Sequence, residues 1–117
     1  MKRADIWWKI PEVSPDSRLL DFGAGGPPAA SSLSCAATFL TSDIRRFREA
    51  EAKGKHAACK LITDVDPNEP ADVVLYEPAQ REAKLRGFEV IDGSFNALVS
   101  GGRFYLAGRK DRGAESY

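Results

Sequence analysis

The chain has little that would support a metal site, a disulfide framework or a membrane span. Its 117 residues include two cysteines and one histidine. Cys35 and Cys59 form no C-x-x-C pattern, so we expect two buried thiols, with no metal centre and no disulfide. No apolar run approaches membrane-spanning length, and the N-terminus is too short and too polar for a signal peptide. We therefore expect a soluble cytoplasmic protein without a membrane partner.

The chain also has no excess of positive or negative charge. Seventeen basic and seventeen acidic residues cancel to a formal net charge of zero. A free-standing nucleic-acid clamp has a strong basic excess, so the composition gives no support for that class of protein. An RNA partner must be inferred from other features of the sequence.

Strand-like and helix-like segments alternate along the chain, which favours a single α/β domain with a parallel sheet and helices on both faces. Residues 1–17 are expected to form an N-terminal helix and turn, and residues 18–117 the domain itself. Gly54 is expected to end the helix at 44–53. The long helix at 78–99 is apolar at Leu85, Phe88, Ile91, Phe95 and Leu98. We expect strands at 18–22, 38–42, 57–62, 72–76 and 103–107, a further helix at 28–37, and an acidic loop at 63–70.

The most informative segment is 19–28, LLDFGAGGPP, where an apolar strand runs into a turn dense in glycine. Glycine lacks a Cβ, so such a turn lets a small molecule approach the main chain. Pro27 and Pro28 suit the first positions of the next helix. The segment therefore predicts a ligand at the end of the first strand.

The residues after the glycines limit the kind of ligand. A P-loop has Lys and Ser or Thr there, whereas this chain has prolines. A dinucleotide-binding turn has a third glycine where Pro28 stands, and proline has no N–H to donate to a pyrophosphate. The turn therefore suits a nucleoside without phosphates, with a fragment of a dinucleotide-dependent reductase as an alternative.

Several segments resemble class I S-adenosylmethionine-dependent methyltransferases. Segment 20–25, LDFGAG, is similar to their first motif, although Pro27 stands where a third glycine is often found. Asp43 has the place of the acidic residue that binds the ribose hydroxyls, a task that suits a two-oxygen acceptor. Asp64 is similar in place to the residue that accepts from the adenine amino group. Segments 72–78 and 98–106 resemble the fourth motif and the entry to the fifth strand.

The resemblance implies a Rossmann-like, doubly wound sheet of order 3-2-1-4-5, truncated because the last two strands of the family fold are not in this sequence. The edge beside strand five would then be open, so we expect a second domain or a second copy of the chain to cover it. The resemblance also implies S-adenosylmethionine as the cofactor. The residues implied to bind it are Asp21, Gly23, Ala24, Gly25, Asp43, Ile44 and Asp64.

The last part of the chain is similar to the ribosomal RNA guanine-N2 methyltransferases of the methyltransferase small-domain group, and nearer to the half of those proteins that has lost catalysis. This likeness implies ribosomal RNA as the partner and a base amino group as the acceptor. In that group strand four ends in Asn-Pro-Pro and an aromatic ring that stacks on the flipped base. Here residues 76–79 read Tyr-Glu-Pro-Ala. Glu77 and Tyr76 are therefore the candidate catalytic residues, in place of the Asn and the ring.

Each candidate also has a structural alternative. Asp43 could cap the helix at 44–53, and Asp64 could be a simple turn residue near Pro67. Because the Asn and the ring are missing, the alternative to an enzyme is a degenerate methyltransferase fold that serves as a structural or RNA-positioning module.

Overall fold

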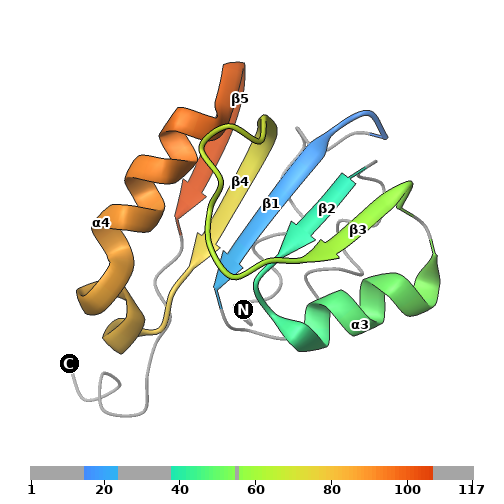
Figure 1. Cartoon of the computed structure of the whole chain (residues 1–117), viewed down its shortest axis with the longest axis horizontal. Helices are drawn as coiled ribbons and strands as arrows, with labels where there is room; N and C mark the ends of the chain where they lie inside the picture. The colour runs from blue at the N-terminus through green and yellow to red at the C-terminus, as the bar shows by residue number, and fades with distance from the viewer. Residues whose placement is uncertain (1–14, 24–37, 55, 107–117) are drawn as a thin grey trace, which may run out of the picture.

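The computed structural model describes residues 15–23, 38–54 and 56–106, which form one sheet with helices packed on it (Figure 1). The strands stand in the order β3-β2-β1-β4-β5, and every neighbouring pair is parallel. The expected Rossmann-like α/β class and strand order are confirmed. The helices expected near the N-terminus and at 28–37 lie outside the described residues. The elements are β1 (Arg18–Gly23), β2 (Thr38–Thr41), α3 (Ile44–Lys53), β3 (Ala58–Leu61), β4 (Ala71–Glu77), α4 (Gln80–Ala97) and β5 (Leu98–Leu106).

The centre of the sheet is more buried than its edges. All of β4 except Asp72 is buried, as expected for an apolar strand covered on both faces of a parallel sheet. β3 and β5, at the two edges, are largely exposed or half-buried. β1 and β4 therefore form the rigid middle from which functional side chains can be positioned.

Alternation along the strands divides their side chains between two faces. One face carries an apolar cluster that includes Val90 of α4. The other face carries Asp21 and Glu77, which contact Arg46 of α3. Tyr76 belongs to the apolar cluster, so it lies on the opposite side of the sheet from its neighbour Glu77. The buried members of the cluster are Leu20, Phe22, Leu40, Ala71, Val74, Tyr76 and Val90.

α3 has the bounds that the sequence predicts. Asp43 is its N-cap, and Oδ1 of Asp43 accepts the backbone N–H groups of Arg45 at 2.8 Å and Arg46 at 3.2 Å. Gly54 is its C-cap with a left-handed φ of 59°, a conformation that favours glycine. Local capping chemistry therefore fixes both ends of this helix.

β5 begins earlier than the sequence predicts. The long helix ends at Ala97, and the strand follows directly from Leu98. We expected the strand to begin at 103, after the two glycines, but it includes Gly101 and Gly102. Gly101 has a φ of 83°, and the pairing of β4 with β5 shifts register between Ala71 and Val73. The glycines thus form an irregularity within the strand.

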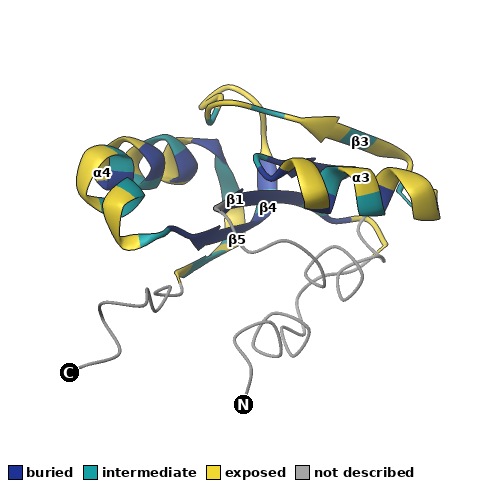
Figure 2. Cartoon of the chain, turned by 90° about the horizontal axis from the view of Figure 1, so that it is seen from below, coloured by how far each residue is buried: buried dark blue, intermediate teal, exposed yellow. Residues whose placement is uncertain are grey.

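α4 packs on the sheet through small side chains. Its buried residues are Gly87, Val90, Ser94 and Ala97, whereas the bulky Leu85, Phe88 and Phe95 are exposed. Figure 2 shows exposed residues along the side of α4 that faces away from the sheet. Of the apolar positions noted in the sequence, Ile91 and Leu98 pack against the core, whereas Leu85, Phe88 and Phe95 lie outside the buried face of the helix. In the described ranges, no helix is long and apolar enough to cross a membrane.

Asp72 ties the start of β4 to the start of β1. Its Oδ2 accepts the backbone N–H of Arg18 at 2.8 Å and the Nε of Arg18 at 2.9 Å. Its Oδ1 accepts Nη2 of the same side chain at 3.2 Å. These hydrogen bonds lower the pKa of Asp72 below its ordinary value. A carboxyl group with a lowered folded pKa stabilises the protein above its unfolded pKa and loses that contribution as the pH falls through the folded pKa.

Asp72→Asn should therefore lower the melting temperature at neutral pH, and the difference from the wild-type chain should shrink as the pH falls below about 4. Thermal unfolding followed by circular dichroism at several pH values measures both quantities. Asp16→Asn is the matched control, because Asp16 is exposed at the same end of the sheet. A difference in melting temperature that does not change with pH would contradict the ionic role of Asp72.

Candidate functional site

An open hollow of about 480 Å³ lies where β1, β2, β3 and β4 end. In open parallel sheets, ligands bind outside the carboxyl ends of the strands at the point where the strand order reverses. Here that point lies between β1 and β4. The hollow is lined by Phe22, Ser42, Ile62, Thr63, Ala79, Glu82 and Arg86.

Arg86 connects the wall of the hollow to the loop after β3. Its guanidinium carbon lies 5.8 Å from the centroid of the Phe22 ring, within cation–π range. Its Nη2 also donates to Oδ1 of Asp64 and forms an ion pair with it. The Asp64 side chain is 74% exposed. One carboxylate oxygen of Asp64 is therefore bound to an arginine that lines the hollow, and the cofactor contact of Asp64 stays a prediction.

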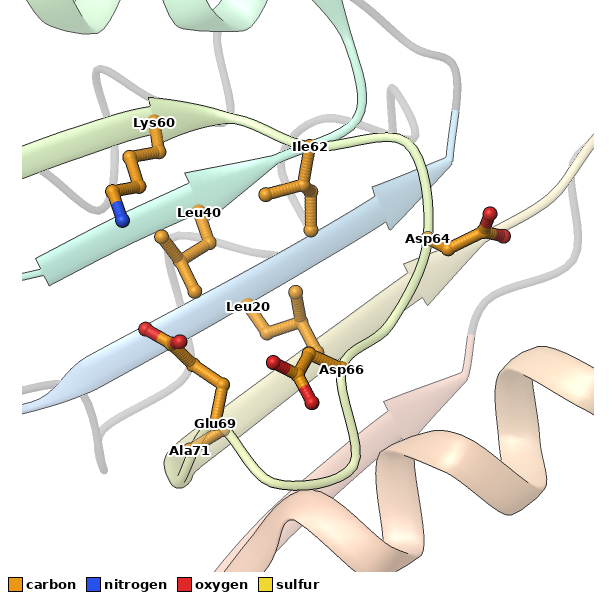
Figure 3. Close-up of a pocket in the computed structure, with 8 residues that line it drawn as sticks. All are labelled: Leu20, Leu40, Lys60, Ile62, Asp64, Asp66, Glu69 and Ala71. Atoms are coloured by element: carbon orange, nitrogen blue, oxygen red, sulfur yellow. The ribbon is translucent and has the colours of Figure 1, made fainter.

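A second cavity, of about 160 Å³, lies beneath the loop that joins β3 to β4. Leu20, Leu40 and Ile62 give it apolar walls, and Lys60 and Glu69 are among the polar residues that also line it (Figure 3). Asp64 also lines it, but its carboxylate is directed away from the cavity. The cavity exists because a loop, not a helix, crosses this part of the sheet.

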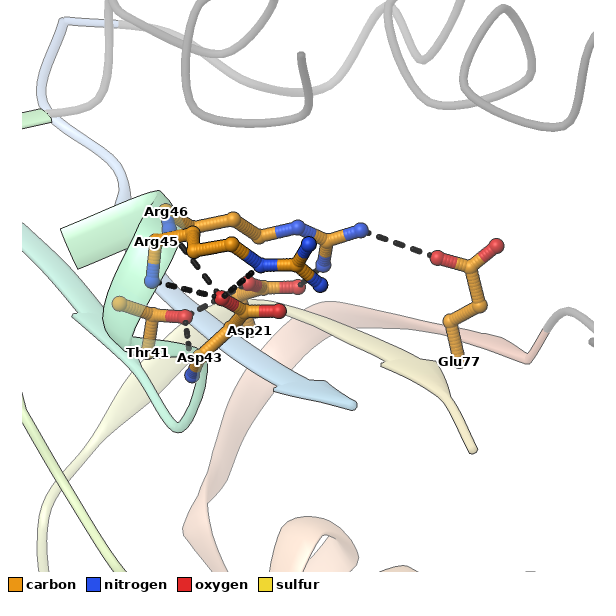
Figure 4. A network of polar contacts seen from close by, with 6 residues as sticks. All are labelled: Asp21, Thr41, Asp43, Arg45, Arg46 and Glu77. Carbon is orange, nitrogen blue, oxygen red and sulfur yellow. Dashed lines mark hydrogen bonds and ion pairs between the residues drawn. The ribbon is translucent and has the colours of Figure 1, made fainter. Parts of the chain in front are cut away.

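A network of buried charges lies on the α3 side of the sheet, shown in Figure 4. Arg46 donates from Nη1 to Oδ1 of Asp21 at 2.7 Å and from Nη2 to Oε1 of Glu77 at 3.0 Å. Thr41 donates its hydroxyl to Oδ2 of Asp21 at 2.8 Å and accepts the backbone N–H of Asp43 at 3.1 Å. Asp21, Arg46 and Glu77 are each at most 2% exposed. One arginine thus joins β1, β4 and α3.

Burial and pairing act in opposite directions on these charges. Burial raises the pKa of Asp21, while Arg46 and Thr41 lower it in part. Burial also disfavours the charged form of Arg46, but the two carboxylates outweigh burial and raise its pKa. A buried ion pair of this kind depends strongly on both partners, because removing one leaves a desolvated charge. The network therefore fixes the carboxyl ends of β1 and β4 relative to α3.

Asp21 has a structural role in the site, because it links β1 to Thr41 and Arg46. Both of its carboxylate oxygens accept hydrogen bonds from the protein, and the residue is fully buried. A direct contact between Asp21 and a cofactor stays a prediction. Asp21 anchors the strand that ends at Gly23, where the glycine turn begins; Ala24 and Gly25 lie outside the described residues.

Asp43 and Ile44 stand at the turn between β2 and α3. The capping role, which the sequence offered as an alternative for Asp43, is confirmed by its hydrogen bonds to the first turn of α3. Asp43 is 7% exposed and Ile44 is 43% exposed, and Ser42 beside them lines the hollow. The ribose contact of Asp43 and the cofactor contact of Ile44 stay predictions.

Tyr76 and Glu77, the candidate catalytic residues, are each 1% exposed. The Tyr76 ring packs edge-on against Phe22, with ring centroids 6.5 Å apart, and its hydroxyl has no hydrogen-bond partner among the described residues. Burial raises the pKa of Tyr76. Because the two side chains lie on opposite faces of the sheet, they do not form one base-binding surface in this structure.

Arg46 is the residue that the sequence reasoning missed. Two signals could have found it. Arg46 and Ala50 are one turn apart on the buried face of α3, and an acidic residue within each of two apolar strands needs a cation once it is buried. Neither signal identifies Asp21 and Glu77 as the partners of Arg46, because these residues are far apart in the sequence.

Sulfur and metal chemistry receive no new support from the described residues. Cys59 is half-buried and forms no disulfide, and burial raises the pKa of its thiol. Cys35 lies outside the described residues. Within them, no group of three or more His, Cys, Asp or Glu side chains is placed to hold a metal ion.

Comparisons with known proteins give no family. The chain matches no protein-family model, no curated protein and no solved structure. What is established is therefore the parallel α/β sheet of five strands and the arrangement of residues at its carboxyl end.

Proposed function

We propose that this chain binds S-adenosylmethionine at the carboxyl ends of β1 and β2 and transfers its methyl group to an amino group of an RNA base. The observation that carries the proposal is the hollow beside the β2–α3 turn, at the switch point of the sheet. The RNA acceptor, with ribosomal RNA in the cytoplasm as the substrate, rests on the likeness of the sequence motifs.

The residues present fit a nucleoside cofactor. A hollow of about 480 Å³ falls within the range of about 300–1,000 Å³ typical of small-molecule sites. Phe22 and Ile62 offer apolar walls that suit a flat base, while Ser42 and Thr63 offer hydroxyl groups. A carboxylate at the end of β2 suits a pair of ribose hydroxyls. The lining thus has apolar walls and hydroxyl groups, and the carboxylate is that of Asp43, which follows the lining residue Ser42 in the sequence.

Each residue would have a separate part in binding. Asp43 would accept from the ribose, and Asp64, at the rim, from the exocyclic amine of the base. The cofactor supplies an electrophilic methyl group. The protein's contribution would be to align the acceptor and exclude water from it. The network around Arg46 would hold the ends of β1 and β4 in place for this task.

Titration calorimetry with S-adenosylhomocysteine tests the cofactor. We expect binding to the wild-type chain and an affinity at least about tenfold lower for Asp43→Asn, because a charged acceptor is replaced by a neutral amide. Asparagine is as good an N-cap as aspartate, so Asp43→Asn should keep α3 intact. A circular dichroism melt verifies that the variant is folded.

Two further variants separate the cap from the ribose contact. Asp43→Ala removes both, so it should lose binding and also lower the melting temperature. Asp16→Asn makes the same chemical change at the opposite end of β1 and should leave the affinity unchanged. No binding to the wild-type chain at millimolar ligand, or equal affinities for the wild-type and Asp43→Asn chains, would falsify the proposal.

The burial of Tyr76 and Glu77 favours a second function, in which the domain binds RNA or holds a structure in place without catalysis. Neither side chain is open to a flipped base in this structure. Incubation with ribosomal RNA and cofactor carrying a radioactive methyl group distinguishes the two functions. Label in the RNA supports the enzyme. Ligand binding in calorimetry with no label in the RNA supports the non-catalytic module.

A further inference from the structure

Bulky apolar side chains gather beside β5, the last strand at one edge of the described sheet. Phe88 is 91% exposed, Leu85 71% and Phe95 58%. Leu106, at the end of β5, is 59% exposed and lines an apolar groove together with Phe88. Phe95 also stacks on Phe104 of β5, with ring centroids 5.0 Å apart. Contiguous apolar surface of this kind marks an interaction site.

The edge strand β5 lies on the same side of the molecule as these apolar side chains. In the described part of the chain, β5 has a strand neighbour on one side only, and α4 lies beside it (Figure 1). An uncovered edge strand offers backbone groups for association with another chain. The apolar surface and the strand edge are therefore neighbours.

The exposed apolar residues Leu85, Phe88 and Phe95 follow one stripe along α4. Phe88 lies at the middle of the helix, which runs from Gln80 to Ala97. At about 100° per residue, the other members of the stripe lie within about 60° of Phe88. Buried Val90 and Ala97 lie on the far side of the helix. We define the α4 stripe as Arg81, Lys84, Leu85, Phe88, Ile91, Asp92 and Phe95, of which Ile91 is half-buried and also packs against the apolar core.

The α4 stripe is complementary to itself when two copies run antiparallel. Lys84 lies one turn before Phe88, and Asp92 lies one turn after it. In a twofold dimer, residue i meets residue j and j meets i. A twofold axis at Phe88 therefore places Lys84 of each copy opposite Asp92 of the other. A parallel arrangement would instead place like charges together.

The apolar positions obey the same symmetry. Leu85 and Ile91 lie at equal distances on either side of Phe88 in the sequence. An antiparallel pair of stripes would bring Leu85 of one copy to Ile91 of the other, with the two Phe88 rings at the axis. An unrelated protein would not require this match between the two ends of one helix.

We propose that a second copy of this chain docks on the α4 stripe, so that the protein is a twofold dimer with antiparallel α4 helices. Leu106 and the apolar groove beside Phe88 would be covered by the partner copy. The dimer does not depend on the cofactor, so its test is independent of the proposed methyltransferase activity.

Size-exclusion chromatography with light scattering, over the micromolar range of protein concentration, measures the association of the full chain. We expect a dimer for the wild-type protein. Lys84→Glu and Asp92→Lys should each raise the dissociation constant about tenfold or more, because each places like charges opposite one another twice. Lys60→Glu, a charge reversal near the other edge of the sheet, should leave the dimer unchanged.

Mixing the two weakened variants gives the decisive result. In a heterodimer of Lys84→Glu with Asp92→Lys, both charge pairs are attractive again, so the mixture should dimerise more tightly than either variant alone. The double variant, with both charges exchanged, should also recover the homodimer. A monomeric wild-type chain overturns the proposal, and so does a dimer that neither substitution weakens.

Discussion

Replacing Arg46 with methionine is expected to lower the free energy of unfolding by about 3–5 kcal/mol. The guanidinium contacts Asp21 at 2.7 Å and Glu77 at 3.0 Å. Its loss would leave two buried carboxylates without the cation that joins them. Urea unfolding followed by circular dichroism measures the change.

Arg45 provides the matched control. It is the neighbouring residue on α3, and its side chain is 66% exposed, so Arg45→Met should change the unfolding free energy by less than about 0.5 kcal/mol. Arg46→Lys should fall between the wild-type and methionine variants, because an ammonium group lacks the planar fork that reaches both carboxylates. A loss below about 1 kcal/mol for Arg46→Met would contradict the role of the buried network.

The loss of stability caused by Arg46→Met should change with pH in a direction that follows from the pKa of Asp21. Burial raises the pKa of Asp21, and Arg46 opposes this rise, so removing the guanidinium raises the pKa further. A carboxyl group with a raised folded pKa contributes stability below its unfolded pKa and loses it as the pH rises through the folded pKa. The deficit of Arg46→Met relative to the wild-type chain should therefore be larger at about pH 7 than at about pH 5.

Alanine at two glycines should have opposite effects on stability. A Cβ at Gly102 would lie 2.9 Å from the carbonyl oxygen of Val99 and 3.1 Å from that of Asp72. The main chain would have to move, so Gly102→Ala should cost about 1–3 kcal/mol. A Cβ at Gly87 would meet no atom within 4 Å. Because alanine favours the helix, Gly87→Ala should stabilise the protein by about 0.5–1 kcal/mol.

The two variants are compared by urea unfolding under identical conditions. Gly87→Ala controls for the loss of glycine flexibility in the unfolded chain, because that term is common to both substitutions. Equal effects for the two variants would mean that the close approach at Gly102 does not determine stability.

The parts of the fold that depend on neighbouring residues were predictable from the sequence. Asp43 and Gly54 mark the ends of α3 because capping involves atoms only a few residues apart. The apolar run at 72–76 predicted the strand that became β4, and such a run is typical of a strand covered on both faces. These signals come from residues that are close together in the sequence, so they can be recognised without the tertiary structure.

Other features depend on packing that the sequence does not specify. The bulky residues of α4 suggested its core face, yet the buried residues of this helix are Gly87, Val90, Ser94 and Ala97. Arg46 is buried only because two acidic residues on different strands meet it. Long-range pairing of this kind follows from the strand order, which sequence periodicity alone does not provide.

The candidate site illustrates how one residue can satisfy two explanations. Gly101 and Gly102 resembled a family motif, but a positive φ at Gly101 and a crowded backbone at Gly102 require glycine without any ligand. Asp43 resembled a ribose-binding acid and is the helix cap. Structural need thus accounts for part of the pattern, and ligand binding has to be measured.

The first turn of α3 is held at two places at once. Asp43 binds the amides at the beginning of the helix, and Arg46 reaches from the same turn into the sheet. The turn is therefore already ordered before any molecule arrives. A ligand that binds there would order little of this turn and lose little affinity through its conformational entropy. Selectivity at this end of the sheet would then depend on how well the shape and charge of a ligand match a preorganised site.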